Sequence, residues 1–449
     1  MDTSLIFKAY DVRGTYPDQL DEVVTRAIGS AFADYVAAPA VVVGRDMRSS
    51  GVALSLAFAE GVRARGVEVI DIGLASTDLL YFASGYLDAP AAMFTASHNP
   101  AAYNGIKLCQ AGAKPIGTDT GLRDIEIATH AYLANPASGT LAPLRERRLI
   151  DEWVDHVHSF VDVDALTRLR IVADTANGMG GLVAPAVFAD LPFEVEILYP
   201  ELDGTFPNHP ADPLNPENIV DLQRRVLESG ADVGLAFDGD ADRVFLVDER
   251  AQPLSGSTTT AMVASVMLER HPGATVLYNV ICSRAVPEVI AESGGVGVRT
   301  RVGHSYIKQV MADTGAIFGG EHSGHYYYRD NYRADSGIIT AMVVLELLSR
   351  SRRPLSEVAA PYVRYADSGE INTRVDDPAG VVAAIAEHAR ASAAAVDELD
   401  GLSATYEDWW FNVRASNTEP LLRLNVEARD AASCDAHVAE LLTLIKEKS

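Results

Sequence analysis

Two adjacent segments, Val41-Val42-Val43-Gly44 and the helical pattern over residues 50–66, give the first indication of the fold. The first is a β-branched run that ends in a glycine, and the second is rich in Ala and Leu. Similar apolar runs occur at Ile171-Val172-Ala173-Asp174 and Val276-Leu277-Tyr278-Asn279, and further helical patterns cover residues 21–37 and 221–230. Buried strands that alternate with helices are typical of βαβ units, whose mainly parallel sheets are covered by helices. The sequence therefore predicts an α/β architecture.

The length of the chain, 449 residues, predicts several domains at about 150 residues per domain. The C-terminal stretch has fewer helices per strand, which predicts an open antiparallel sheet with helices on one side. Its expected strands cover residues 370–375, 402–406, 409–413 and 421–428, and its expected helices cover residues 378–395 and the stretch from residue 430 onward. We expect three α/β domains and one α+β domain, at residues 1–147, 148–250, 251–366 and 367–449.

The composition limits the partners that the chain can have. The formal net charge is −25, which opposes binding to nucleic acid and to anionic membranes. The three cysteines are far apart and form no CxxC pair, and residues 1–4 lack the start of a signal peptide. The apolar stretch at residues 337–348 is too short to span a bilayer and is expected to be a buried helix. We expect a cytoplasmic protein that binds a small molecule.

The most informative motif is Phe237-Asp238-Gly239-Asp240-Ala241-Asp242-Arg243-Val244, which lies between two expected strands. Its three carboxylates are spaced two apart, and the small residues between them allow the loop to curl around one hard cation. Mg²⁺ is favoured over Ca²⁺ because so few carboxylates leave room for phosphate oxygens. An EF-hand is excluded, since its sixth position is Arg243 rather than glycine and strands flank the loop. The alternative is a solvated turn.

A second motif, Thr95-Ala96-Ser97-His98-Asn99-Pro100, follows the apolar run at residues 91–94. A hydroxyl at the end of a strand is well placed to be a nucleophile, although a helix N-cap or a serine turn would have the same composition. The GxSxG pattern of hydrolases is absent around Ser97. Lys107, in Asn104-Gly105-Ile106-Lys107, places an ammonium group within reach of the same turn.

Two later loops have the composition of binding loops. Gly319-Gly320-Glu321-His322-Ser323-Gly324-His325 offers the donors and acceptors that sugar hydroxyls need, whereas zinc is disfavoured without Cys ligands or an HExxH pattern. Arg414-Ala415-Ser416-Asn417-Thr418-Glu419-Pro420, with Arg423 beyond it, forms a plausible phosphate cradle, and an ordinary polar hairpin is the alternative. The glycine-rich stretches at residues 177–181 and 294–297 lack complete dinucleotide and P-loop patterns.

Taken together and in this order, the motifs closely resemble the α-D-phosphohexomutase superfamily, particularly the phosphomannomutase/phosphoglucomutase group. The match runs from Phe7-Lys8-Ala9-Tyr10-Asp11-Val12-Arg13-Gly14 to the Arg414 loop and covers nearly the whole chain. The resemblance implies four domains around a central cleft: three related α/β domains and a C-terminal domain that resembles the TATA-binding-protein fold.

The resemblance also implies the roles of individual residues. Ser97 would carry the phosphoryl group and would bind one Mg²⁺ per chain together with Asp238, Asp240 and Asp242. The remaining catalytic residues would be Arg13, Lys107 and His304, with Lys107 and His304 as general acid or base. The substrate-binding residues would be Tyr10, Arg243, Glu321, Ser323, His325, Arg414, Ser416, Asn417, Thr418 and Arg423.

The implied activity is that of a phosphomannomutase, a phosphoglucomutase or both. Such an enzyme interconverts hexose 1-phosphate and hexose 6-phosphate through a phosphoserine, with a hexose 1,6-bisphosphate as intermediate and activator. The alternatives are a phosphoglucosamine mutase, whose loops usually read GEQSGH and RPSGTE, a metal-dependent sugar phosphatase, and a non-catalytic sugar-phosphate sensor. An intact Ser97 argues against a sensor. The expected assembly is a monomer or a homodimer.

The sequence departs from the family pattern in one place, because Ile281 replaces the lysine that some relatives have before a Cys-Ser/Thr pair. One contact to the sugar or its phosphate is therefore missing or is supplied by another cation. The candidates are Arg284, Arg299 and Arg301.

Overall fold

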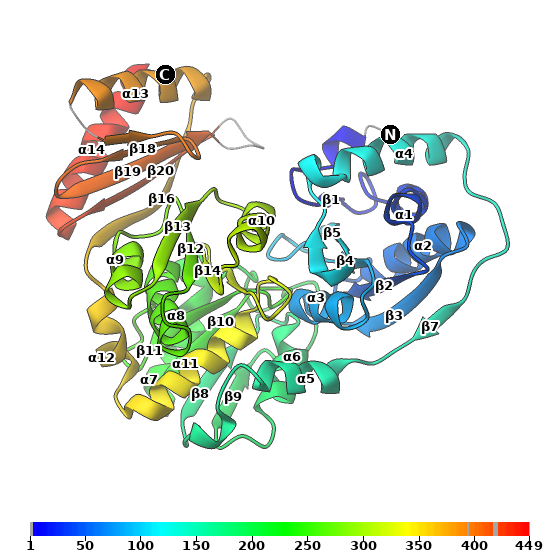
Figure 1. Cartoon of the computed structure of the whole chain (residues 1–449), viewed down its shortest axis with the longest axis horizontal. Coiled ribbons are helices and arrows are strands. Elements are labelled where there is room, and N and C mark those ends of the chain that lie inside the picture. The colour runs from blue at the N-terminus through cyan, green and yellow to red at the C-terminus, as the bar shows by residue number, and fades with distance from the viewer. Residues whose placement is uncertain (1–2, 393–394, 416–420, 449) are drawn as a thin grey trace.

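The computed structural model describes residues 3–392, 395–415 and 421–448, which form four units in chain order, each built around one sheet (Figure 1). The first unit has a mixed sheet of order β1-β5-β4-β2-β3-β7, with β6 paired to β5. Its strands β4, β2, β3 and β7 are parallel, whereas β5 runs antiparallel to β4 and β1. Its elements are β1 (Val12–Thr15), α1 (Glu22–Val36), β2 (Ala40–Arg45), α2 (Gly51–Ala64), β3 (Glu68–Leu74), α3 (Thr77–Tyr86), β4 (Ala91–Phe94), β5 (Tyr103–Gln110), β6 (Lys114–Pro115), α4 (Leu122–Ala134) and β7 (Leu144–Glu146).

The second and third units repeat one plan, in which three parallel strands carry one antiparallel strand at an edge. The sheet orders are β11-β10-β8-β9 and β13-β12-β14-β15, with β11 and β15 antiparallel. The second unit contains α5 (Ile150–His158), β8 (Arg170–Asp174), α6 (Gly180–Phe188), β9 (Glu194–Leu198), α7 (Val220–Ser229), β10 (Val233–Phe237) and β11 (Val244–Asp248). The third contains α8 (Gly256–Arg270), β12 (Thr275–Asn279), α9 (Ala285–Glu292), β13 (Val296–Thr300), α10 (His304–Thr314), β14 (Phe318–Gly320), β15 (Tyr326–Tyr328), α11 (Gly337–Ser351) and α12 (Leu355–Ala359).

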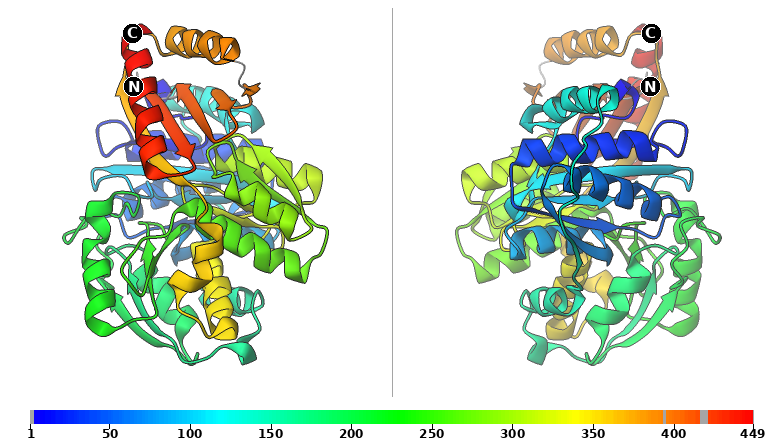
Figure 2. Two further views of the ribbon diagram at one scale, coloured as in Figure 1. Left: turned by 90° about the vertical axis from the view of Figure 1, so that its left-hand side faces the viewer. Right: turned by 90° about the vertical axis from the view of Figure 1, so that its right-hand side faces the viewer.

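The fourth unit is the expected antiparallel sheet, of order β16-β20-β19-β18-β17. It contains β16 (Ala366–Arg374), α13 (Pro378–Ala391), β17 (Ala395–Asp397), β18 (Leu402–Thr405), β19 (Trp409–Ala415), β20 (Leu421–Ala428) and α14 (Ala431–Lys448). The two helices contact each other and lie together on the outer side of the sheet (Figure 2). The α/β and α+β classes predicted from the sequence are confirmed, while the residue limits given for the four domains stay predictions.

The cores explain how the units are joined. One large apolar cluster contains buried residues of the first three units, whereas the fourth unit has a cluster of its own. Helix α11 lies inside the large cluster, and its Ile338, Met342 and Leu345 are fully buried. An apolar stretch without a polar face is stable only where it is surrounded by other elements, so residues 337–348 form the buried helix that was expected. Within the described residues, no helix is long and apolar enough to cross a membrane.

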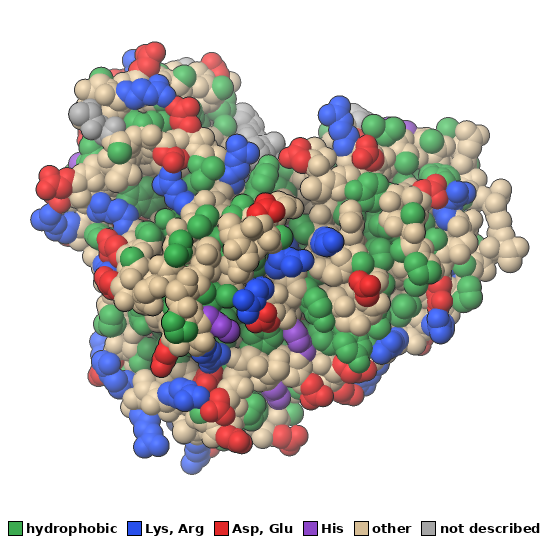
Figure 3. Space-filling view, in the orientation of Figure 1, with side chains coloured by type: hydrophobic (Ala, Val, Ile, Leu, Met, Phe, Trp, Pro, Cys, Tyr) green, Lys and Arg blue, Asp and Glu red, His purple; other side chains and the backbone are tan. Residues whose placement is uncertain are grey.

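The chain topology brings three loops together. The loops after β4, β10 and β14 all leave the carboxyl ends of parallel strands, which is where α/β sheets bind ligands. Figure 3 shows that the surface is hollowed between the first and the fourth units, with Lys and Arg side chains beneath the hollow. The three loops that the sequence predicts to be functional therefore lie at the edge of the sheets where α/β proteins bind ligands.

Candidate active site

The loop that contains Ser97 is held in an unusual conformation. Ser97 has a φ of 49°, in the left-handed region that non-glycine residues rarely adopt, and its backbone N–H donates to Thr95 Oγ1 at 2.9 Å. The side chain is 5% exposed. Strained backbone of this kind persists only where surrounding contacts fix it, and it is concentrated at functional sites.

Arg48 supplies the contacts that fix the loop. Its guanidinium donates to four backbone carbonyls, those of Ser97 (2.8 Å), Asn99 (2.7 Å), Pro100 (2.9 Å) and Tyr103 (2.9 Å). Asp46 accepts a further bond from Arg48 Nε at 3.2 Å, and both side chains are almost completely buried. Burial raises the pKa of Asp46 to about 6, although Arg48 opposes the rise. Sequence reasoning missed this pair, whose only signal is its position at the end of β2.

The acidic loop approaches Ser97 very closely. A Cβ atom on Gly239 would lie 2.4 Å from the Ser97 carbonyl oxygen, so only glycine allows the two loops to meet. Ser97 Oγ donates to Asp238 Oδ2 at 2.8 Å, and Arg243 Nε donates to the same oxygen at 2.9 Å. The turn between β10 and β11 thus places a carboxylate and a guanidinium against the serine hydroxyl.

The three aspartates of this loop form one buried cluster. Asp238, Asp240 and Asp242 are at most 1% exposed, and they offer one carboxylate oxygen each within 4.8 Å of one another. Oδ1 of Asp240 and Oδ1 of Asp242 are buried and have no hydrogen-bond partner in the part of the chain that the structure describes. Oxygen ligands that lack protein donors suit a hard divalent cation, so the residues present fit the expected metal.

Lys107, on β5, offsets part of this negative charge. Its Nζ contacts Asp240 Oδ2 at 2.8 Å and Asp242 Oδ2 at 2.6 Å. Burial would lower the pKa of Lys107, but the two carboxylates outweigh burial and raise that pKa well above its usual value. Burial also raises the pKa of Asp238 to about 7, with Asp242 and Asp240 adding to the rise against the opposing effect of Arg243. The site therefore places a protonated lysine among the carboxylates of the acidic loop.

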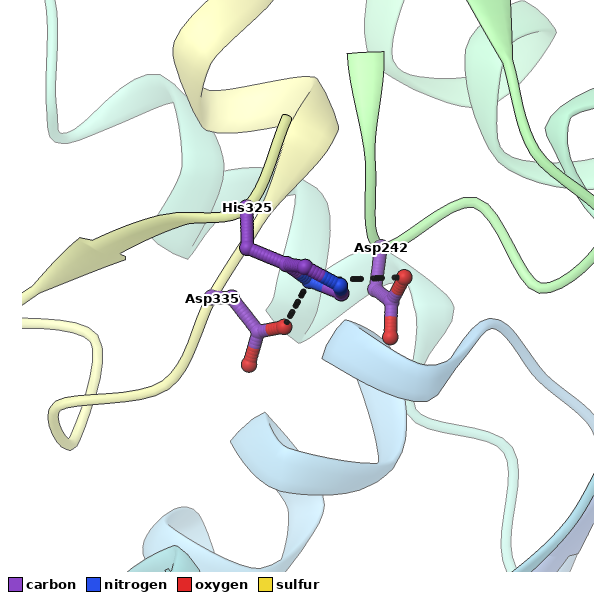
Figure 4. A group of neighbouring side chains, drawn as sticks. All are labelled: Asp242, His325 and Asp335. Atoms are coloured by element: carbon purple, nitrogen blue, oxygen red, sulfur yellow. Dashed lines mark hydrogen bonds and ion pairs between the residues drawn. The ribbon is translucent and has the colours of Figure 1, made fainter. Parts of the chain in front are cut away.

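His325 faces this cluster from the third unit. Its Nδ1 lies 2.8 Å from Asp335 Oδ2 and 4.0 Å from Asp242 Oδ1, as Figure 4 shows. Lys308 Nζ forms an ion pair with the other oxygen of Asp335 at 3.0 Å. Burial lowers the pKa of His325, but the hydrogen bond to Asp335 and the negative charges of Asp242 and Asp335 together outweigh burial, so the net shift is upward. His325 therefore has the orienting carboxylate that a proton-transferring histidine needs.

His304 has a different environment. It begins α10, its Nδ1 is buried without a partner among the described residues, and its ring packs edge-on against Tyr10 at 5.5 Å. Burial lowers its pKa well below the usual value, and nearby Lys308 adds to the effect. Among the described residues, His325 lies 4.0 Å from Asp242, whereas His304 forms no ion pair with the three aspartates.

Glu321 joins three segments of the third unit. Its Oε1 accepts from Asn279 Nδ2 at 3.1 Å and from the Gly303 N–H at 3.0 Å, and its Oε2 accepts from the Tyr327 hydroxyl at 2.7 Å. Only 2% of Glu321 is exposed, and Ser323 is half-buried. The expected contact of these two residues with a sugar stays a prediction, and the conformation seen assigns Glu321 a role in holding the loop.

A second part of the site lies between three units. A cavity of about 440 Å³ is lined by Tyr10, Arg301, Asp400, Arg414 and Arg423, among others. Burial raises the pKa of Tyr10 to about 12.

Arg414 and Arg423 face each other across β19 and β20, and both contact Glu370, at 2.7 and 3.6 Å. Ser416, Asn417 and Thr418, expected in the same loop, lie outside the described residues.

The three arginines considered as replacements for the missing lysine have different surroundings in the structure. Arg284 lies 3.7 Å from Glu427, and Arg299 pairs with Asp397. Arg301 donates from Nε to the Leu399 carbonyl at 2.8 Å and lines the 440 Å³ cavity. Of the three, Arg301 is the one that faces the cavity.

Arg13 lies near the serine loop from the other side. Its guanidinium donates to Asn99 Oδ1 and to Asp11 Oδ2, both at 2.5 Å. The described residues expected to act in catalysis and metal binding therefore meet around Ser97, apart from His304, which lies with Tyr10 beside the cavity.

Family models match the chain along most of its length. They are described as phosphoglucomutase/phosphomannomutase alpha/beta/alpha domain I at residues 4–133, domain II at residues 151–252, domain III at residues 255–365 and the C-terminal domain at residues 370–444.

Whole-chain comparisons agree with these matches. A phosphomannomutase of Salmonella typhimurium is 40% identical and covers 98% of this chain and 99% of its own length. A protein of Xanthomonas campestris named "Phosphohexose mutases" is also 40% identical, with the same coverage. The crystal structure of a phosphoglucomutase/phosphomannomutase family protein from Burkholderia thailandensis superposes with a TM-score of 0.89 at 32% identity, covering 99% of this chain and 98% of that one. This chain belongs to the phosphoglucomutase/phosphomannomutase family.

Proposed function

We propose that this protein is a phosphomannomutase, an isomerase that interconverts mannose 1-phosphate and mannose 6-phosphate by way of a phosphorylated Ser97. The observation that carries the proposal is the 2.8 Å hydrogen bond between Ser97 Oγ and Asp238 Oδ2 within a buried acidic cluster. Relatives that are 40% identical over nearly the whole chain are named phosphomannomutases, which supports mannose as the sugar. Glucose phosphates are the second substrate class, because the family includes phosphoglucomutases.

The reaction consists of two transfers. In the first, the bond between phosphorus and Ser97 Oγ breaks while a bond forms from phosphorus to the free hydroxyl oxygen of the hexose monophosphate, giving a hexose 1,6-bisphosphate. In the second, the other phosphoryl group of the reoriented bisphosphate returns to Ser97. Catalysis of such transfers depends mainly on positioning and on neutralising charge. Arg48 positions the loop, and Arg243, Lys107 and Arg13 provide the positive charge.

The expected metal is one Mg²⁺ per chain. Asp238, Asp240, Asp242 and Ser97 would hold it, and it would neutralise charge on the transferring phosphoryl group. The unpartnered Oδ1 atoms of Asp240 and Asp242 are the observation that supports this assignment.

The protons of the hexose hydroxyl need an acceptor and a donor. His325 suits this task because Asp335 fixes the orientation of its ring and raises its pKa against the effect of burial. Lys107 is assigned to charge compensation, since a lysine whose pKa lies well above its usual value stays protonated. His304 is assigned to the wall of the site next to Tyr10.

The non-reacting phosphate would bind in the 440 Å³ cavity between the first, third and fourth units. Arg301, Arg414 and Arg423 line this cavity, and guanidinium groups bind phosphate through paired hydrogen bonds. Glu370 contacts Arg414 and Arg423 in the present conformation, so phosphate binding would compete with that carboxylate for both arginines.

The test is phosphorus NMR of the purified protein with mannose 1-phosphate, Mg²⁺ and a trace of glucose 1,6-bisphosphate. We expect mannose 6-phosphate to form, and we expect Ser97→Ala to abolish its formation. The matched control is Ser159→Ala, which removes an exposed serine hydroxyl at the end of α5. Release of free phosphate instead of mannose 6-phosphate would identify a phosphatase, and an unchanged spectrum would identify a binding protein; either result would refute the proposal.

A further inference from the structure

A second cavity, of about 500 Å³, lies where the first unit meets the second, and it shares no lining residue with the candidate active site. Arg45 lines it from the carboxyl end of β2, and Gly73 and Leu74 line it from the end of β3. Arg147 and Arg148 come from the short segment that connects β7 to α5. We call this space the arginine cavity, after Arg45, Arg147 and Arg148.

The guanidinium groups of the arginine cavity are poorly neutralised by the protein. Arg45 Nε is buried and has no hydrogen-bond partner within the described ranges, and Arg148 forms no ion pair there. Arg147 reaches Glu152 only at 4.0 Å. In a chain whose net charge is −25, cations that face a hollow without a close carboxylate partner favour an anionic ligand.

The other lining residues indicate which groups the ligand has besides its negative charge. Asp71 and Glu146 offer carboxylate oxygens, which accept hydrogen bonds from hydroxyl or amino groups. Leu74 is exposed at the cavity wall, and Leu182 adds a further apolar side chain, with Leu79 and Leu149 buried behind them. The volume falls within the range of about 300–1,000 Å³ that is usual for small-molecule sites.

We propose that the arginine cavity binds a nucleoside diphosphate. Its diphosphate would contact the three guanidiniums, its ribose hydroxyls would donate to the carboxylates, and its flat base would lie on the apolar wall. A simple sugar phosphate fits less well, because the C–H face of a sugar ring covers less apolar surface than a nucleobase does. This site is separate from the proposed phosphomannomutase chemistry and goes beyond it.

Backbone contacts connect the arginine cavity to the active site. The Arg45 carbonyl accepts from the Ala75 N–H at 2.9 Å, and the next residue, Asp46, donates its N–H to the Phe94 carbonyl at 2.9 Å. Asp46 in turn holds Arg48, which fixes the loop of Ser97. A ligand on Arg45 would therefore lie directly behind the strand ends that position the nucleophile.

The test is isothermal titration calorimetry of the full chain with ADP, GDP and inorganic pyrophosphate, without Mg²⁺. We expect a nucleoside diphosphate to bind more tightly than pyrophosphate, and we expect the double variant Arg147→Gln/Arg148→Gln to weaken that binding by about tenfold or more. Both side chains are exposed, so the double variant should fold normally. The matched control is Arg123→Gln, an exposed arginine on α4, which should leave the affinity unchanged.

Arg423→Gln separates this site from the active-site cavity that Arg423 lines, because it should bind the nucleoside diphosphate as the wild type does. The proposal is overturned if neither nucleotide binds at about 1 mM, or if the double variant binds as tightly as the control. Pyrophosphate that binds as tightly as the nucleotides would also overturn it, because the apolar wall and the carboxylates would then contribute nothing.

Discussion

Replacing Arg48 with lysine should weaken both the fold and the reaction. The guanidinium of Arg48 donates to four carbonyls of the loop that contains Ser97 and also to the buried Asp46. A lysine keeps the charge but has three donors on one nitrogen, so it cannot reproduce five bonds in a fixed plane. Each buried carbonyl that loses its donor costs about 1–3 kcal/mol, and water can satisfy some of them. We expect a loss of about 2–4 kcal/mol in the free energy of unfolding.

The loss of catalytic rate should be larger for Arg48→Lys than for the same substitution at an arginine far from the site. A displacement of about 1 Å at the nucleophile can cost about a hundredfold in rate, so we expect kcat of Arg48→Lys to fall at least tenfold, to about a tenth or less. Urea denaturation followed by circular dichroism measures the stability, and the mutase assay at saturating substrate measures kcat. The matched control is Arg65→Lys, whose exposed side chain pairs with Asp34. If Arg48→Lys loses less than about 1 kcal/mol and keeps its kcat, the role assigned to Arg48 is wrong.

Three further changes test other parts of the site. Gly239→Ala would place a Cβ 2.4 Å from the Ser97 carbonyl; we expect about 1–3 kcal/mol less stability in urea denaturation and slower turnover, and unchanged values would contradict the close approach. Burial raises the pKa of Asp78 to about 7, so an unfolded Asp loses its proton from about pH 4 upward while the folded one keeps it. Asp78 alone should therefore make stability fall by up to about 1.4 kcal/mol per pH unit between about pH 4 and 7. Asp78→Asn should make the slope in a pH series of urea titrations less steep by that amount, and Asp46 and Asp238, whose pKa values are also raised, account for the slope that remains. His325→Gln should lower kcat by about a hundredfold or more in the mutase assay, and a larger loss in His304→Gln would reverse the assignment of the proton-transferring histidine.

Most of the fold could be predicted because several strands are short and apolar and end at a glycine or a polar residue. The runs at residues 41–44 and 276–279 lie within β2 and β12, and the helix predicted over residues 221–230 is α7. The helix predicted over residues 378–395 was too long, because α13 ends at Ala391 and Ala395 begins β17. The sequence did not reveal β17, since Ala395–Asp397 has only three residues and no alternation to detect. It also did not reveal that β5 is antiparallel to β4, because strand direction depends on pairing between distant residues.

The candidate site was predictable where one local motif carries the chemistry. The loop of three aspartates and Ser97 were both found this way, and the structure brings them within a hydrogen bond of each other. The supporting residues were not predictable, because they act across long separations in the chain. Asp335 reaches His325 only after β15 and a turn, and Arg48 reaches Ser97 from 49 residues away.

The choice between the two histidines shows the same limit. Family resemblance suggested His304 as general acid or base and His325 as a sugar contact. The sequence contains no information about which ring has a carboxylate behind it. In the structure, His325 Nδ1 lies 2.8 Å from Asp335 Oδ2, whereas Nδ1 of His304 is buried and has no partner in the described part of the chain.

The most direct test is to follow one phosphoryl group during a single turnover. The protein is phosphorylated with glucose 1,6-bisphosphate, freed of ligand and digested, and mass spectrometry locates the added group; a second portion is mixed with mannose 6-phosphate. We expect the modification on Ser97 alone, and we expect it to leave the protein as mannose 1,6-bisphosphate appears. Turnover by a protein whose Ser97 stays unmodified would contradict the central claim.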